Sequence, residues 1–150
     1  MNPLKQFDDF LKEGVVRRQS PDKEKAKFLI EEAENSYLSL LDMLKKVSIN
    51  NQNANTFIKN AYDPIMELIR AILLIKGFNS SGSHAHEAEV AYLRKLKFSE
   101  TDVEFANQLR YFRNGIRYYG TILNEEYTKK VVEFTKKIYP KLKELTKRLV

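Results

Sequence analysis

The chain contains no cysteine, and it has only five glycines, four prolines and two histidines among its 150 residues. The absence of cysteine excludes a disulfide framework, a thiol nucleophile and a metal site built on thiolates. No apolar run approaches the ~20 residues that span a bilayer, and the N-terminus carries no signal-peptide pattern. We therefore expect a cytoplasmic protein without a membrane partner.

The composition indicates one ordinary globular domain. Hydrophobic residues make up 43% of the chain and charged residues 31%, which is typical of a folded protein rather than a disordered one. We expect a single domain over 1–150, with an N-terminal helix and connector in 1–20 and the core in 22–150. The net charge of +6 favours an anionic partner, although many basic proteins bind no nucleic acid.

Apolar residues recur every three or four positions through most of the chain, which is the period of amphipathic helices. No segment shows the alternation expected of a strand. The predicted fold class is all-α: an up-and-down bundle of four to five helices, preceded by a short helix. The expected helical segments are 3–12, 22–47, 56–77, 84–96, 99–120 and 124–149, with loops at 17–21, 48–55 and 78–83.

The ends of these helices carry capping signals. Ser83, Ser99 and Asn124 are each placed to act as the N-cap of the helix that follows. Pro64 lies inside the segment 56–77 and leaves two alternatives open. Either the helix kinks there, or Asp63 caps a fresh helix with Pro64 at its first position.

The segment 99–120, SETDVEFANQLRYFRNGIRYYG, separates into two helical faces. One face is apolar and is expected to pack on the core. It consists of Phe105, Leu109, Phe112, Ile116 and Tyr119. The other face is turned well away from it and consists of Arg110, Arg113, Asn114 and Arg117. Gly115 lies beside these arginines and suggests close approach by a backbone or a ligand. The alternative is a solvated basic face near a helix C-terminus.

The two histidines, His84 and His86, are two positions apart and therefore point to opposite sides of a helix. They cannot chelate one ion as an i, i+4 pair could, so we expect no metal site and assign both to capping or solvated roles. The sequence also lacks a Ser–His–Asp signature, a glycine-rich phosphate loop and a Rossmann fingerprint. We expect no cofactor.

The order of these segments resembles the HEPN domains. The resemblance covers roughly residues 22–150 and rests on AYDPIMELIRAILLIKG, on the helix start at Ser83 and His84, and on LRYFRNGIRYYG. HEPN domains are bundles of four or five helices and are commonly dimeric. Many are metal-independent ribonucleases, often toxins paired with a nucleotidyltransferase antitoxin, and others only bind nucleotides or RNA.

The motif of this family is an arginine, usually followed by asparagine, with a histidine about four to six residues after the arginine. Arg113 matches the motif arginine and Asn114 the polar residue, but Tyr118 or Tyr119 stands in the place of the histidine. RNA cleavage needs a proton acceptor and a cation for the developing charge. A tyrosine with an ordinary pKa of about 10 is a poor base at neutral pH, yet it can bind a phosphate or stack on a base.

The resemblance therefore implies three hypotheses. The leading one is a HEPN-like homodimer whose cleft binds RNA or a nucleotide through Arg110, Arg113, Asn114 and Arg117, with weak or absent ribonuclease activity. The second is a non-catalytic module that partners a separate nucleotidyltransferase of the toxin–antitoxin type. The third is an active, metal-independent endoribonuclease in which Tyr118 or Tyr119 replaces the catalytic histidine beside Arg113.

Overall fold

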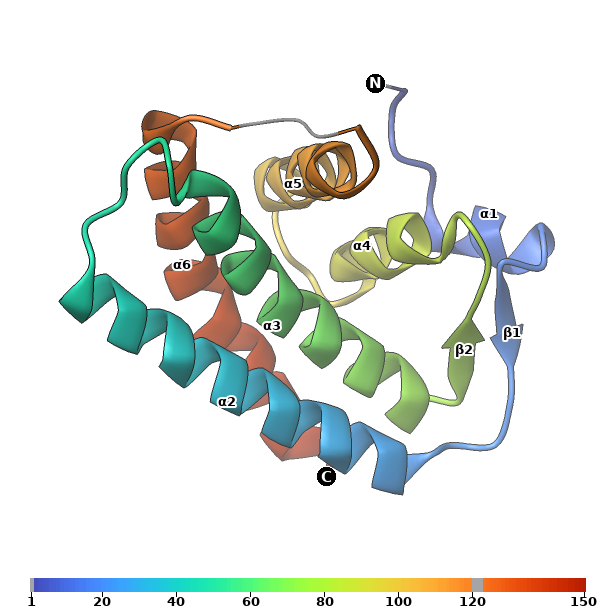
Figure 1. Ribbon diagram of the computed structural model, residues 1–150. Coiled ribbons are helices and arrows are strands. Elements are labelled where there is room, and N and C mark those ends of the chain that lie inside the picture. Colours follow the sequence, from blue (N-terminus) through green and yellow to red (C-terminus); the bar gives the residue numbers. More distant parts are fainter. Residues whose placement is uncertain (1, 120–122) are drawn as a thin grey trace.

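The computed structural model describes the backbone of residues 2–119 and 123–150, and their side chains except those of 116–119. The described residues form six helices and two short strands, which confirms the predicted all-α bundle (Figure 1). The elements are α1 (Phe7–Lys12), β1 (Val16–Arg18), α2 (Lys23–Lys46), α3 (Ala54–Ile75), β2 (Phe78–Ser80), α4 (Ala85–Lys95), α5 (Glu100–Tyr119) and α6 (Glu125–Leu149).

Helix α3 is the centre of the fold. It contacts α2, α4, α5 and α6, and Figure 1 shows α3 beside α2, with α6 behind them. Because neighbours cover it on nearly all sides, large side chains such as Phe57, Leu68 and Ile72 are completely buried. Each contributes roughly 1.5–3 kcal/mol, so together they outweigh the cost of about 3 kcal/mol for a proline inside a helix. Helix α3 therefore continues through Pro64, and the alternative of a fresh helix starting there is wrong.

Two of the predicted N-caps are confirmed and one is wrong. The Ser99 hydroxyl accepts a hydrogen bond from the Asp102 amide (3.1 Å), and the Asn124 side chain accepts one from the Tyr127 amide (2.8 Å). Such caps are worth about 1 kcal/mol each. Helix α4, however, follows His84 rather than Ser83 as its N-cap residue.

The strands β1 and β2 were not expected, and the predicted N-terminal helix 3–12 is shorter, since α1 spans only Phe7–Lys12. Val16 pairs with Ser80 and Arg18 with Phe78 in an antiparallel ladder. Three residues are too few to show a period of two, and the pairing joins segments about sixty positions apart. Gly77, which precedes β2, allows the backbone of Gln19 to approach closely. It has φ +83°, and an added Cβ would lie 2.8 Å from the Gln19 carbonyl oxygen.

Helix α5 buries more of its circumference than the sequence pattern suggested. As expected, Phe105 and Phe112 pack on α6, with ring centroids 6.1 and 5.2 Å from that of Tyr127. Val103 and Ala106 are also buried, and α5 as a whole contacts α3 and α4 as well.

The arginines of α5 continue this second buried face. Val103, Ala106, Arg110 and Arg113 are spaced i, i+3, i+7 and i+10, so they lie along one side of the helix. Arg110 is only 8% exposed. The alternative of a solvated basic face is therefore wrong for Arg110. Arg113, which is partly buried, lies toward the helices that build the candidate site.

Candidate functional site

Arg113 and Asn114 line an open cavity of about 460 Å³ that four helices enclose. We call it the Arg113 cavity. A cavity of this size accommodates a nucleotide-sized ligand. The other lining residues are Leu29, Glu32 and Ser36 of α2, Tyr62, Asp63, Met66, Glu67 and Arg70 of α3, and His86 of α4.

Two buried polar atoms of this cavity have no hydrogen-bond partner among the described residues. They are the Arg113 Nε and the Tyr62 hydroxyl oxygen. The Arg113 guanidinium lies over the Tyr62 ring, 5.8 Å from its centroid. Burial raises the pKa of Tyr62, so its hydroxyl stays protonated and is available as a donor. An unpartnered buried donor costs about 1–3 kcal/mol, and a hydrogen bond to a ligand oxygen would recover that cost.

Carboxylates lie in the wall of the same cavity. Desolvation raises the pKa of Asp63, while the charges of Arg113 and Arg70 oppose the shift. Partial burial, together with the charges of Asp63 and Glu32, raises the pKa of Glu67 to about 7. The cavity therefore combines donors for an anion with acceptors for hydroxyl or amino groups.

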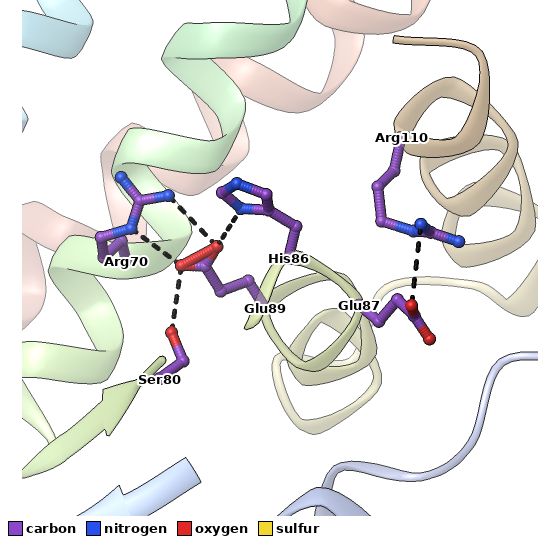
Figure 2. A network of polar contacts seen from close by, with 6 residues as sticks. All are labelled: Arg70, Ser80, His86, Glu87, Glu89 and Arg110. Carbon is purple, nitrogen blue, oxygen red and sulfur yellow. Dashed lines mark hydrogen bonds and ion pairs between the residues drawn. The ribbon is translucent and has the colours of Figure 1, made fainter. Parts of the chain in front are cut away.

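Two residues of the cavity wall, Arg70 and His86, belong to a network centred on the buried Glu89 of α4 (Figure 2). Glu89 is 1% exposed and accepts hydrogen bonds from Arg70 Nε (2.8 Å) and Nη2 (3.1 Å), from His86 Nδ1 (2.8 Å), and from the Ser80 hydroxyl (3.3 Å). Burial acts to raise the pKa of Glu89, but the hydrogen bonds from His86 and Arg70 outweigh it and hold this pKa below its ordinary value. Glu89 is therefore an ionised carboxylate that connects α4 to α3 and β2.

Arg110 does not join Arg113, although the sequence placed both in one binding row. Its guanidinium donates from Nε to Asn107 Oδ1 (2.9 Å), and its Nη1 lies 3.9 Å from Glu87 Oε1. Glu87 also lies 3.1 Å from His84 Nδ1, and Figure 2 shows Glu87 and Glu89 on opposite sides of α4. Arg110 and His84 line a different cavity of about 580 Å³, next to the N-terminal segment.

The remaining predicted site residues cannot be placed. The side chains of Arg117, Tyr118 and Tyr119 lie outside the described residues, as does Gly120. Over the described parts of the chain, no group of three or more His, Asp or Glu side chains has the arrangement of a metal site. Across 2–119 and 123–150, no helix combines the length and the apolar character needed to cross a membrane.

A larger cavity of about 680 Å³ lies between the N-terminus of α5 and α6. Two of its four cationic side chains are paired, Lys137 with Asp102 at 2.9 Å and Arg148 with Glu144 at 3.8 Å. Unlike the Arg113 cavity, it is lined by none of the buried polar atoms that lack a partner in the described structure.

No family model, curated protein or solved structure matches this chain. The functional interpretation therefore depends on the site itself and on the resemblance carried by Arg113 and Asn114.

Sequence reasoning missed Tyr62, Arg70, His86 and Glu89 as site residues, although two patterns pointed to some of them. Asp63, Glu67 and Arg70 are spaced i, i+4 and i+7, so they form one polar stripe on the otherwise apolar segment 61–75. The sequence HAHEAE places a glutamate three residues after each histidine, which is the spacing of a helical contact. No local pattern distinguished Tyr62 from the other aromatic residues of the core.

Proposed function

We propose that the protein binds the phosphate of RNA or of a nucleotide in the Arg113 cavity. The observation that carries this proposal is the pair of buried donors without partners, Arg113 Nε and the Tyr62 hydroxyl, which meet at one cavity. Nearly all buried polar groups in proteins are hydrogen-bonded, so a pair of exceptions at one place favours a missing acceptor. A phosphate oxygen accepts from both, and Asn114 adds an amide beside them.

The carboxylates favour a nucleotide over a simple anion. Asp63 and Glu67 can accept hydrogen bonds from ribose hydroxyls or base amino groups, whereas inorganic phosphate would only be repelled by them. The resemblance to HEPN domains supports the same assignment, because Arg113 and Asn114 are the residues that match the family's motif.

We expect one Arg113 cavity, and therefore one bound ligand, for each chain of the homodimer implied by the HEPN resemblance. Titration calorimetry combined with light scattering measures both the stoichiometry and the oligomeric state.

The experiment that tests the proposal compares Arg113→Met with Arg148→Met. Arg148 has a 70% exposed side chain on α6 and supplies a control with the same loss of charge. Calorimetry with a short single-stranded RNA and with 5′-AMP should show at least tenfold weaker binding for Arg113→Met, since a hydrogen bond to a charged group contributes about 1.5–3 kcal/mol. The salt dependence of RNA binding should lose about one unit of slope.

Arg148→Met should bind within about twofold of the wild type. Equal affinities for the two variants, or no binding of either ligand by the wild type, would contradict the proposal.

A further inference from the structure

The Arg113 cavity contains a histidine that is already oriented for proton transfer. His86 Nδ1 lies 2.8 Å from Glu89 Oε1 (Figure 2). Because Glu89 is an ionised carboxylate, it can only accept, and the hydrogen of a neutral His86 must therefore reside on Nδ1. The other ring nitrogen, Nε2, is then a free base. A carboxylate that fixes the tautomer and orientation of an imidazole in this way is the arrangement of many catalytic histidines.

His86 is also accessible to a ligand. Its side chain is 46% exposed and lines the same cavity as Arg113 and Asn114. The other groups of this cavity that carry or exchange charge are Glu32 of α2, Asp63, Glu67 and Arg70 of α3, and Arg113 of α5. Histidine is the side chain that proteins use most often as a general base.

We propose that His86 is the catalytic proton acceptor of an RNA-cleavage reaction in the Arg113 cavity, with Glu89 as its positioning residue. This inference rests on the proposed function. It assigns the base to α4, whereas the sequence had left it to Tyr118 or Tyr119.

In the step we infer, His86 Nε2 removes the proton of a ribose 2′-hydroxyl. The 2′-oxygen forms a bond to the adjacent phosphorus, the bond from phosphorus to the 5′-oxygen breaks, and that oxygen leaves with a proton from water. The products are a 2′,3′-cyclic phosphate end and a free 5′-hydroxyl. Arg113 stabilises the negative charge that develops on the phosphorane oxygens, and neither an oxidant nor a metal takes part.

A merely structural role for His86 makes different predictions. Helix α4 is held to the fold by its buried apolar residues and by the hydrogen bonds of Glu89 with Arg70 and Ser80, and all of these contacts persist without the imidazole. Loss of His86 should therefore change the rate of cleavage and leave both folding and RNA binding almost unchanged.

The test uses the full chain in EDTA with a single-stranded RNA, and with the same strand carrying 2′-deoxyriboses. Cleavage is followed on gels, and the product ends are identified by mass spectrometry. His86→Gln is compared with His84→Gln. His84 is the N-cap residue of α4, contacts Glu87 as His86 contacts Glu89, and lines the cavity that contains Arg110. Binding affinity and thermal unfolding are measured for each variant.

We expect the wild type to cleave RNA to cyclic phosphate ends and to leave the deoxy strand intact. His86→Gln should lower kcat at least 100-fold, in the range typical of a lost general base, with Kd within twofold. His84→Gln should match the wild type, and the loss of cleavage in His86→Gln, purified in the same way, then excludes a contaminating nuclease. Glu89→Gln should lower kcat and alter the basicity of the imidazole, which the acidic limb of the pH–rate profile reports.

RNA binding without any cleavage by the wild type would overturn this inference and leave the proposed function intact. Cleavage by His86→Gln at the wild-type rate would do the same. Absence of RNA binding would overturn both.

Discussion

Replacement of Tyr62 by phenylalanine should stabilise the protein and weaken its ligand binding at the same time. The Tyr62 hydroxyl is buried and lacks a hydrogen-bond partner in the described part of the chain. The ring is 6% exposed, and phenylalanine fills the same space without the oxygen. The variant therefore removes an unsatisfied polar atom from the folded state without opening a void.

The size of the effect follows from the cost of burying a polar group. An unpartnered buried hydroxyl costs about 1–3 kcal/mol, so the free energy of unfolding should rise by about that amount. In a chain of 150 residues, 1 kcal/mol changes Tm by about 2–4 °C, and Tm should therefore rise by roughly 2–12 °C. A phosphate loses one donor in the variant, which should weaken RNA binding about tenfold.

Tyr139 provides the matched control. Its hydroxyl is also buried without a described partner, but it lies on α6 and does not line the Arg113 cavity. Thermal unfolding followed by circular dichroism should show a higher Tm for both Tyr62→Phe and Tyr139→Phe. Calorimetry with RNA should show weaker binding for Tyr62→Phe alone. A lower Tm for Tyr62→Phe would refute the reasoning, because it would mean that the hydroxyl has a stabilising partner.

Two further predictions concern charged groups. Glu89→Ala should lower the free energy of unfolding by about 3 kcal/mol in urea titrations, because Arg70 loses both of its hydrogen bonds to Glu89. The double variant Arg70→Met, Glu89→Met should recover most of this loss. A loss below about 1 kcal/mol for Glu89→Ala would contradict the stabilising role of the network. Burial raises the pKa of Glu67 to about 7 from an ordinary 4.5, so the folded state holds a proton that the unfolded chain releases, and stability falls as pH rises through this window. Glu67→Gln should leave Tm unchanged at pH 4 and raise it by a few degrees at pH 8. This corresponds to a gain of roughly 1–2 kcal/mol in the free energy of unfolding, after allowance for solvent screening of the partly exposed side chain. An equal effect at both pH values would exclude the raised pKa of Glu67 as the cause.

The sequence by itself determined the helices and several of their boundaries. Helical periodicity and caps such as Ser99 and Asn124 depend on residues three or four positions apart, so the chain carries this information locally. The same locality made Arg113 and Asn114 recognisable as a candidate site, since they are neighbours within a motif.

Only the tertiary structure decided which residues meet in that site. The rotation of α5 about its axis is set by its packing on α3, α4 and α6 together, and it turned Arg113 into one cavity and Arg110 into another. Tyr62 and His86 come from two other helices, far away in the sequence. Their approach to Arg113 depends on long-range packing that a local pattern does not encode, because many rotations of the helices satisfy the same apolar periodicity.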